Sequence, residues 1–339
     1  MPTFCRHNHL IQNCPICSRE QSIELRPIVS SSAPRSTVRT PGGSQRRTSG
    51  SSQRRTSSPR PAAGGRPGAG VRVRRLARGA DDGFRCGLVP GLKSSADAER
   101  LAEELAFAAR RLRQLAEDPP SLYAEIAASE ADIEERTWLA FLTAYISPRG
   151  GADPFASVRL ARTTWASGQP PRLEGIGTGP RTAHDPDRGT ATIDAYRAWA
   201  QRAGSQAAAF GGEAAWTPER RFARGFERLA LPGFHRDARF DLLTTLGWLG
   251  AYELRAGALQ LGGDNEATVA AKRAMGIGDP LLLERRAAEL ANACGVPLEA
   301  LDLGLHNWGT GERATLGLGT AVEPDEPTLD AVREALGLP

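Results

Sequence analysis

The chain must turn sharply at Pro232-Gly233, because this breaker pair separates two segments whose apolar residues recur with helical spacing. A helix should begin after Thr217, a favourable N-cap residue, since Pro218 suits the first helical position and the acidic Glu219 follows it. The apolar positions are Phe222, Phe226 and Leu229 before the turn and Phe240, Leu243, Leu246 and Leu249 after it. The pattern predicts a helix-hairpin-helix element.

A hairpin of this kind has a physical use at a phosphate backbone. The turn and the start of the next helix present backbone N–H groups, which can hold a DNA phosphate without reading the base sequence. The residues expected to contact DNA in this way are Leu231, Pro232, Gly233, Phe234, His235 and Arg236. The alternative is an ordinary helical protein in which this turn only ends a helix.

The hairpin resembles that of the helix-hairpin-helix DNA glycosylase superfamily, helical enzymes of base excision in which it commonly reads L-P-G-hydrophobic-G. Leu231 to Phe234 match this pattern, whereas His235 stands where the second glycine is usual. Bifunctional members of the superfamily carry a Schiff-base lysine just after the hairpin, and Asp237 occupies the corresponding place here. The resemblance also implies a catalytic aspartate at the start of a later helix, for which Asp264 is the candidate.

Asp264 is open to two compatible interpretations. An aspartate at a helix N-terminus accepts backbone N–H bonds and lies at the positive end of the helix dipole, and both effects keep it ionised. An ionised carboxylate in a cleft can stabilise a cationic sugar transition state or activate a nucleophile. The alternative is that Asp264 only caps its helix. Any imine-forming lysine would have to be Lys93 or Lys272, because the chain has no other lysine.

Three stretches are similar to the alpha-glutamyl/putrescinyl thymine pyrophosphorylase families, particularly their third clade. They are residues 231–250, residues 270–291 and the HNWG sequence at 306–309, and the resemblance as a whole covers roughly residues 85–315. It implies an enzyme of thymine hypermodification, in which a pyrophosphorylated hydroxymethyl base loses pyrophosphate to an amine or amino-acid co-substrate such as putrescine or glutamate. Repair or restriction of modified DNA would fit the same fold.

The basic charge of the chain is concentrated in one segment. Residues 26–80 contain 13 arginines and no acidic residue, so that removing them from the formal net charge of +4 leaves −9 on the rest. The segment is also rich in Ser, Thr, Pro and Gly and has no apolar period, which predicts a disordered linker. It is either an arm that tracks nucleic acid electrostatically or a solvated spacer.

A Cys/His cluster near the N-terminus has the spacing of a zinc knuckle. Cys5, His9, Cys14 and Cys17 form a C-x3-H-x4-C-x2-C set, with His7 as the alternative nitrogen ligand. Thiolates and imidazole at this spacing suit tetrahedral Zn²⁺, and metal binding would supply the folding energy that so short a segment lacks. The set leaves no open ligand position, so a structural Zn(2+) is expected. The alternative is an accidental cluster in a tail.

The apolar periodicity predicts an all-α fold with four parts. These are a zinc knuckle at 1–22, a linker at 23–83, a helix-hairpin-helix glycosylase-like domain at 84–318 and an extension with a short helix at 319–339. The stretch Ile133–Ile146 is hydrophobic nearly all round, which predicts a central buried helix. No segment has the apolar length of a membrane span or of a signal peptide, so a cytoplasmic, nucleoid-associated protein without membrane contact is expected.

Three local features complete the expectations. Ser94 or Ser95 should cap a helix. Residues 167–189 are rich in Gly and Pro and predict a long loop, with His184 solvated and the loop as a candidate lid over a cleft. Residues 252–261 look like a β-like insertion between the hairpin and Asp264.

Three functions from different classes remain open at this point. The first is an enzyme acting on a modified or damaged DNA base, which needs a pocket for a flipped base. The second is a non-catalytic DNA-binding module, and the third is a protein-interaction scaffold that uses the zinc knuckle. An Asp264 that faces a cleft beside the hairpin would favour the enzyme, and a solvent-facing Asp264 would favour the other two.

Overall fold

The computed structural model describes residues 79–318 and 325–339, all of which belong to one unit, Gly70–Pro339. These ranges contain twelve α-helices, one 3-10 helix and no strand, which confirms the prediction of an all-α fold. None of their helices is long and apolar enough to cross a membrane. The helices are α2 (Ser95–Glu117), α3 (Leu122–Ala127), α4 (Ile133–Ile146), α5 (Ala156–Ala161), the 3-10 helix η2 (Pro186–Arg188), α6 (Ala191–Arg202), α7 (Gln206–Gly211), α8 (Pro218–Arg228), α9 (Arg236–Trp248), α10 (Glu266–Met275), α11 (Pro280–Ala293), α12 (Leu298–Thr310) and α13 (Glu326–Leu336).

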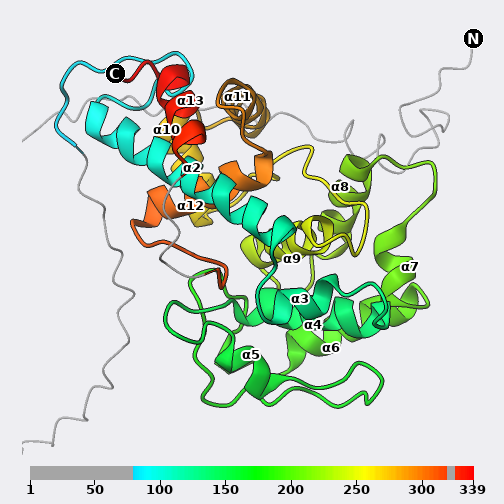
Figure 1. Ribbon diagram of the computed structural model, residues 1–339. Coiled ribbons are helices and arrows are strands. Elements are labelled where there is room, and N and C mark those ends of the chain that lie inside the picture. Colours follow the sequence, from blue (N-terminus) through cyan, green and yellow to red (C-terminus); the bar gives the residue numbers. More distant parts are fainter. Residues whose placement is uncertain (1–78, 319–324) are drawn as a thin grey trace, which may run out of the picture. The chain divides into compact units, whose positions relative to one another are not determined.

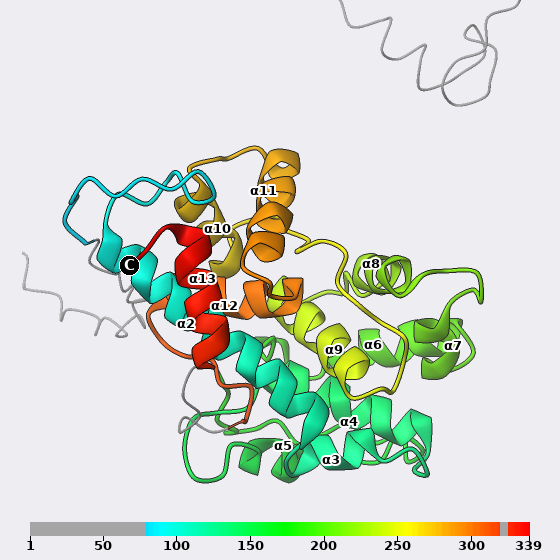
Figure 2. The ribbon, with the colours of Figure 1, turned by 45° about the horizontal axis from the view of Figure 1, so that its top comes forward.

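The helices fall into two groups that meet at α9. In the first group, α2 packs against α12 and α13, while α12 also packs against α10 and α11 (Figure 1). In the second group, α4 packs against α3, α5 and α7. The helix α9 contacts both α4 and α2 (Figure 2). The helix that follows the hairpin turn is therefore placed between the two groups, where few of its side chains can reach solvent.

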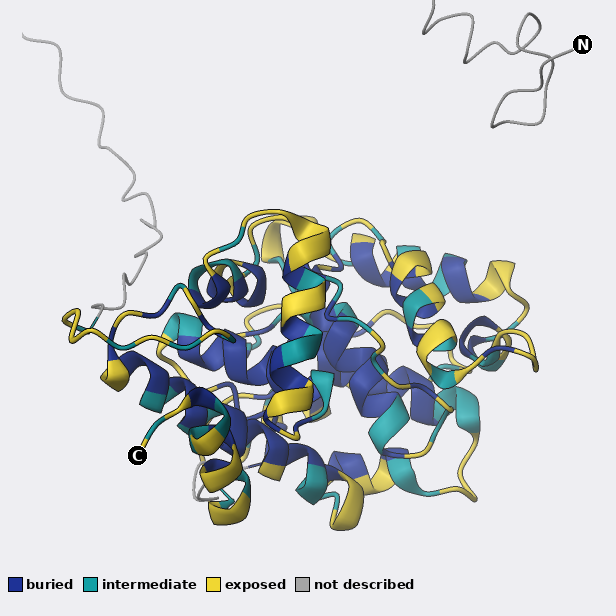
Figure 3. Ribbon diagram, turned by 90° about the horizontal axis from the view of Figure 1, so that it is seen from above, coloured by how far each residue is buried: buried dark blue, intermediate teal, exposed yellow. Residues whose placement is uncertain are grey.

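The helix α4 is buried on nearly every side, as its sequence predicts. Every residue from Arg136 to Ile146 is buried. The helices of the domain show dark blue, buried residues on their inner sides in Figure 3. Phe141 stacks on Tyr196 of α6 with 3.7 Å between ring centroids and lies 5.3 Å from the ring of Phe234. The residue after the glycine of the hairpin turn is thus anchored in this aromatic core.

The start of α2 is held by a carboxylate from upstream. Ser94 is the N-cap residue, but its side chain makes no capping hydrogen bond. The backbone N–H of Ser95 instead donates to Asp82 at 2.9 Å, and hydrogen bonds from Ser95 lower the pKa of Asp82. Residues upstream of position 84 therefore take part in the packing of the domain.

The expected β-like insertion at 252–261 is wrong, because residues 251–265 contain no strand. Carboxylates from neighbouring helices satisfy backbone groups here that a strand partner would otherwise satisfy. Glu299 of α12 accepts from the N–H of Ala256 at 2.9 Å, and Glu284 of α11 accepts from the N–H of Leu259 at 2.8 Å. The segment is an irregular loop tied to two helices.

The helix α13 joins the end of the chain to α2. Its buried residues are Leu329, Val332 and Leu336. At its N-terminus, Arg113 of α2 lies 2.7 Å from Asp325, and Asp325 also caps α13 by accepting from the N–H of Thr328. The C-terminal helix therefore packs as part of the helical domain.

Candidate functional site

The two helices and the tight turn between them lie where the sequence predicts them. Thr217 caps α8 by accepting from the N–H of Arg220 at 3.3 Å, with Pro218 in the first turn. The N–H of Phe234 donates to the carbonyl of Leu231 at 3.1 Å, and Gly233 has a φ of +78°, a conformation that favours glycine. The apolar faces predicted for both helices are buried.

The hairpin turn is packed against α6 and is not fully open to solvent. The hydroxyl of Thr192 donates to the carbonyl of Pro232 at 2.9 Å, and a Cβ at Gly233 would lie 2.4 Å from the same hydroxyl oxygen. Of the six hairpin residues expected to contact DNA, Pro232 and His235 are exposed. A phosphate at the turn would therefore meet mainly these two residues.

Substitution of Gly233 tests whether the side chain of Thr192 fills the space beside the hairpin turn. Gly233→Ala should destabilise the protein by roughly 1–2 kcal/mol for the positive φ, and by more for the contact with Thr192. Gly250→Ala is the matched control, because Gly250 has a φ of +68° but no atom within 4 Å of its Cβ position. Urea unfolding should show a clearly larger loss for Gly233→Ala. An equal loss in the two variants, together with weakened DNA binding in Gly233→Ala alone, would show that the turn is an open phosphate contact.

The side chain of Arg236 points into the domain, although the sequence placed it among the DNA contacts. Its guanidinium pairs with Asp302 of α12 and lies 3.1 Å from Asp237, and it donates to the carbonyl of Leu259. Only 6 % of the side chain is exposed. With these partners in the interior, Arg236 does not present its charge at the hairpin surface.

Arg236 belongs to a buried charge cluster that the sequence does not predict as a whole. Its centre is Arg181, whose side chain is fully buried and comes from the Gly/Pro-rich loop. The Nε of Arg181 donates to Asp241 at 2.8 Å, and its Nη2 donates to Asp241 at 2.8 Å and to Asp302 at 2.6 Å. We use the name buried charge cluster for Arg181, Arg236, Asp237, Asp241, Asp302 and His306.

The charges of the cluster move the pKa values of Arg181 and Asp237 toward their ionised forms, whereas burial raises the pKa of Asp241. Burial alone would lower the pKa of Arg181, but the carboxylates of Asp241, Asp302 and Asp237 raise it well above its ordinary value. Burial alone would likewise raise the pKa of Asp237, yet Arg181, His306 and Arg236 hold it well below the usual range. The cluster places three carboxylates and one imidazole around two guanidiniums.

Asp237 is the member of the cluster best placed for chemistry. It lies in the first turn of α9, and 14 % of its side chain is exposed, whereas the carboxylate of Asp302 is 1 % exposed. The Nδ1 of His306 lies 3.6 Å from Asp237 Oδ2, and neither ring nitrogen of His306 has a hydrogen-bond partner among the described residues. A carboxylate that stays ionised in this way can stabilise a developing cation.

The sequence contains a signal for part of this cluster. Asp237 and Asp241 are four residues apart in α9, as are Asp302 and His306 in α12, so each pair lies on one helix face within an otherwise apolar segment. Buried charges in such positions must be paired. Arg181 has no comparable local signal, because it lies in a loop.

Asp264 is exposed in the turn before α10, and the prediction that it caps this helix is wrong. The N-cap is Asn265, whose side chain accepts from the N–H of Thr268 at 2.9 Å. Both residue types are good caps, so the sequence did not distinguish them. Of the two lysines, Lys93 is exposed and Lys272 is half-buried, with its Nζ 3.5 Å from the carbonyl of Gly263.

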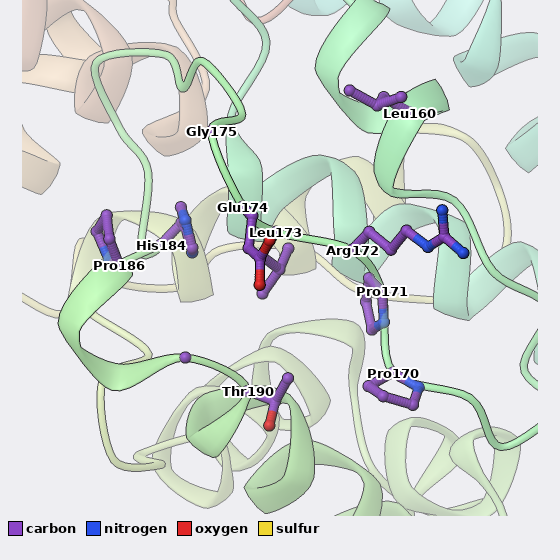
Figure 4. A pocket seen from close by; sticks show the side chains of 11 residues that line it. Leu160, Pro170, Pro171, Arg172, Leu173, Glu174, Gly175, His184, Pro186 and Thr190 are labelled. Carbon is purple, nitrogen blue, oxygen red and sulfur yellow. The ribbon is translucent and has the colours of Figure 1, made fainter.

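A cavity of about 970 Å³ lies along the loop at 167–189 (Figure 4). Arg172, Glu174 and His184 are among its lining residues. His184 is half-buried and not solvated as expected: its Nδ1 lies 3.1 Å from the hydroxyl of Tyr145. Burial lowers the pKa of His184 and raises that of Tyr145 to about 12, so both are held in their neutral forms near pH 7. Most of the lining is apolar or glycine, and Glu174 is the one acidic residue among its lining residues.

The expected zinc ligands Cys5, His9, Cys14 and Cys17, with the alternative His7, lie outside the described residues. Within residues 79–318 and 325–339, no group of three or more His, Cys, Asp or Glu side chains could hold a metal ion. The zinc knuckle thus stays a prediction from the spacing of these residues.

Comparison with known proteins adds no relative. No family model, no curated protein and no solved structure matches the chain.

Proposed function

We propose that the helical domain acts on a modified, thymine-derived or damaged base in DNA, by base-modification or glycosylase-like chemistry. The observation that carries the proposal is Asp237, an ionised and partly exposed carboxylate in the first turn after the hairpin. The sequence resemblance to helix-hairpin-helix DNA glycosylases and to thymine pyrophosphorylases supports DNA as the substrate. In the bifunctional members of that superfamily, the position of Asp237 holds the reactive lysine.

The proposed chemistry depends on the negative charge of the Asp237 carboxylate. Cleavage at the glycosidic bond develops positive charge on the sugar, and displacement of pyrophosphate develops it on the carbon attached to the base. Asp237 would stabilise either cation. Its negative charge is available because Arg181 and Arg236 keep it ionised, and the imidazole of His306 lies 3.6 Å from it. A base has to leave the helical stack to reach a carboxylate in this position.

The other expected parts have supporting roles in this proposal. The arginines at 26–80 would supply non-specific attraction to DNA, and a structural Zn(2+) would order residues 1–22. An amine or amino acid would act as the second substrate if the chemistry is displacement of pyrophosphate. The protein would work at the nucleoid in the cytoplasm.

A second function is favoured by the position of Asp264. The carboxylate that the superfamily resemblance singles out is exposed in a turn, which suits a non-catalytic DNA-binding or protein-interaction module. In that case the buried charge cluster would only hold the loop, α9 and α12 together. Activity measurements separate the two functions.

The decisive measurement uses the purified full chain and duplex DNA that contains thymine, hydroxymethylated thymine analogues or their pyrophosphorylated forms. The reactions are run with and without putrescine and glutamate and analysed by mass spectrometry of the DNA. We expect a released base or a mass change with one modified duplex and none with unmodified thymine. Unchanged DNA in every reaction, with binding intact, would support the non-catalytic module.

A further inference from the structure

The solvent face of α8 carries arginines at regular spacing. Arg220, Arg224 and Arg228 are exposed and follow one another at intervals of four residues, so they lie on the same side of the helix. The opposite side is apolar and buried through Phe222 and Phe226. The chain outside residues 26–80 has a formal net charge of −9, so this row of cations is opposite in sign to the net charge around it.

Two of these arginines are held in place by one indole ring. The guanidinium carbons of Arg220 and Arg228 lie 5.3 Å and 5.6 Å from the ring centroid of Trp216, which is 9 % exposed. Such cation–π contacts restrict the long side chains before any ligand binds. Less conformational entropy is then lost when the guanidiniums meet an anion, which favours binding.

A fourth arginine comes from the neighbouring helix α6. Arg202 and Arg228 both line a hollow of about 350 Å³, together with Trp199, Ala203 and Ala209, and no acidic residue is among its lining residues. In Figure 2, α6, α7 and α8 lie together at one side of the domain, in agreement with their packing contacts. The lining of the hollow therefore contains two cationic side chains, those of Arg202 and Arg228, and the indole of Trp199.

The arginines differ in whether an acid already neutralises them. Arg224 pairs with Glu227 at 2.8 Å. Arg202, Arg220 and Arg228 form no ion pair with any residue in the described ranges. Three guanidiniums at this face therefore remain for an external anion.

We propose that this arginine face, made up of Arg202, Arg220, Arg224 and Arg228, binds the sugar-phosphate backbone of duplex DNA. The spacing fits: Arg220 to Arg228 spans about 12 Å of helix axis, over which one strand of a duplex presents roughly three to four phosphates. The hairpin turn follows Arg228 directly, so the same DNA can pass from this face to Pro232 and His235. The proposal rests on DNA as the substrate, but it concerns binding and not the reaction.

The test is the salt dependence of binding to a 25-base-pair duplex of mixed sequence, measured on the full chain. The variant R202Q/R220Q/R228Q should lower the slope of log K against log salt by about 2.7, since each lost phosphate contact removes about 0.9. Between 50 and 200 mM salt, the affinity of the unaltered chain should then fall about 40-fold more than that of the variant.

The control variant R110Q/R285Q/R286Q removes the same number of exposed charges from α2 and α11. It should leave the slope within a few tenths of that of the unaltered chain. The variant R202K/R220K/R228K retains the charge and should restore most of the slope. If the triple glutamine variant fails to fold, R202Q alone, which leaves the contacts of Arg220 and Arg228 with Trp216 in place, should still lower the slope by about 0.9.

A slope in R202Q/R220Q/R228Q equal to that of the control would overturn the proposal and place the phosphate contacts elsewhere, as in residues 26–80. Loss of binding to duplex RNA or to phosphatidylserine vesicles with DNA binding unchanged would overturn it as well. A failure of the catalytic proposal has a different signature: the DNA remains chemically unchanged, while the salt slope still depends on these arginines.

Discussion

Replacement of Arg181 by methionine should lower the free energy of unfolding by about 3–5 kcal/mol, because it leaves two buried carboxylates without their cation. Asp241 and Asp302 both accept hydrogen bonds from Arg181, whose side chain is fully buried. Methionine fills a similar length but donates nothing. The remaining carboxylates would have to bind protons or admit water, and either response costs stability.

Urea unfolding followed by circular dichroism at pH 7 measures this loss. Arg159→Met is the matched control: Arg159 also pairs with an aspartate, Asp153, but their side chains are 44 % and 54 % exposed, so a change of about 0–1 kcal/mol is expected. Adding Asp241→Leu and Asp302→Leu to Arg181→Met should recover part of the loss, since a well-packed apolar replacement of a buried ion pair can be neutral. Equal stability of Arg181→Met and Arg159→Met would show that the cluster is not held together by Arg181.

Asp237→Asn should abolish most of the activity on an identified modified duplex, by about 10²-fold or more, while DNA binding changes little. Asparagine keeps the shape of the side chain but removes the negative charge that a developing cation needs. Asp264→Asn makes the same chemical change at an exposed turn residue and should retain near-complete activity. The two variants thus compare the carboxylate that the structure favours with the one that the resemblance singles out.

The charge of Asp237 can be checked independently through the pH dependence of stability. Its pKa in the folded protein lies below the unfolded value of about 3.9, so its ionised form stabilises the fold above that pH and the contribution is lost as the pH falls. The stability difference between the unaltered chain and Asp237→Asn should therefore shrink as the pH is lowered from 6 to 3. If Asp264→Asn is inactive and Asp237→Asn fully active, the catalytic assignment returns to Asp264.

The elements that the sequence predicted correctly depend on neighbours along the chain. The cap at Thr217, the turn after Leu231 and the apolar faces of α8 and α9 follow from local preferences and from helical spacing, as does the burial of α4. These features can be read from the sequence, because caps, turns and apolar helix faces depend on residues that lie within one or two helical turns of each other.

The buried charge cluster was decided by packing between distant segments, as was the place of Arg202 beside the arginines of α8. Arg181 meets Asp241 and Asp302 from 60 and 121 residues away, and Arg236 turns inward because Asp302 lies there. No spacing rule connects such positions, since the loop that carries Arg181 could lie over many parts of the surface. The helical periodicity of the sequence was enough to determine an all-helical fold with a hairpin before α9. Which charges are buried in pairs and which remain at the surface was determined only by the packing of the helices, because packing decides which charged groups lose their contact with water.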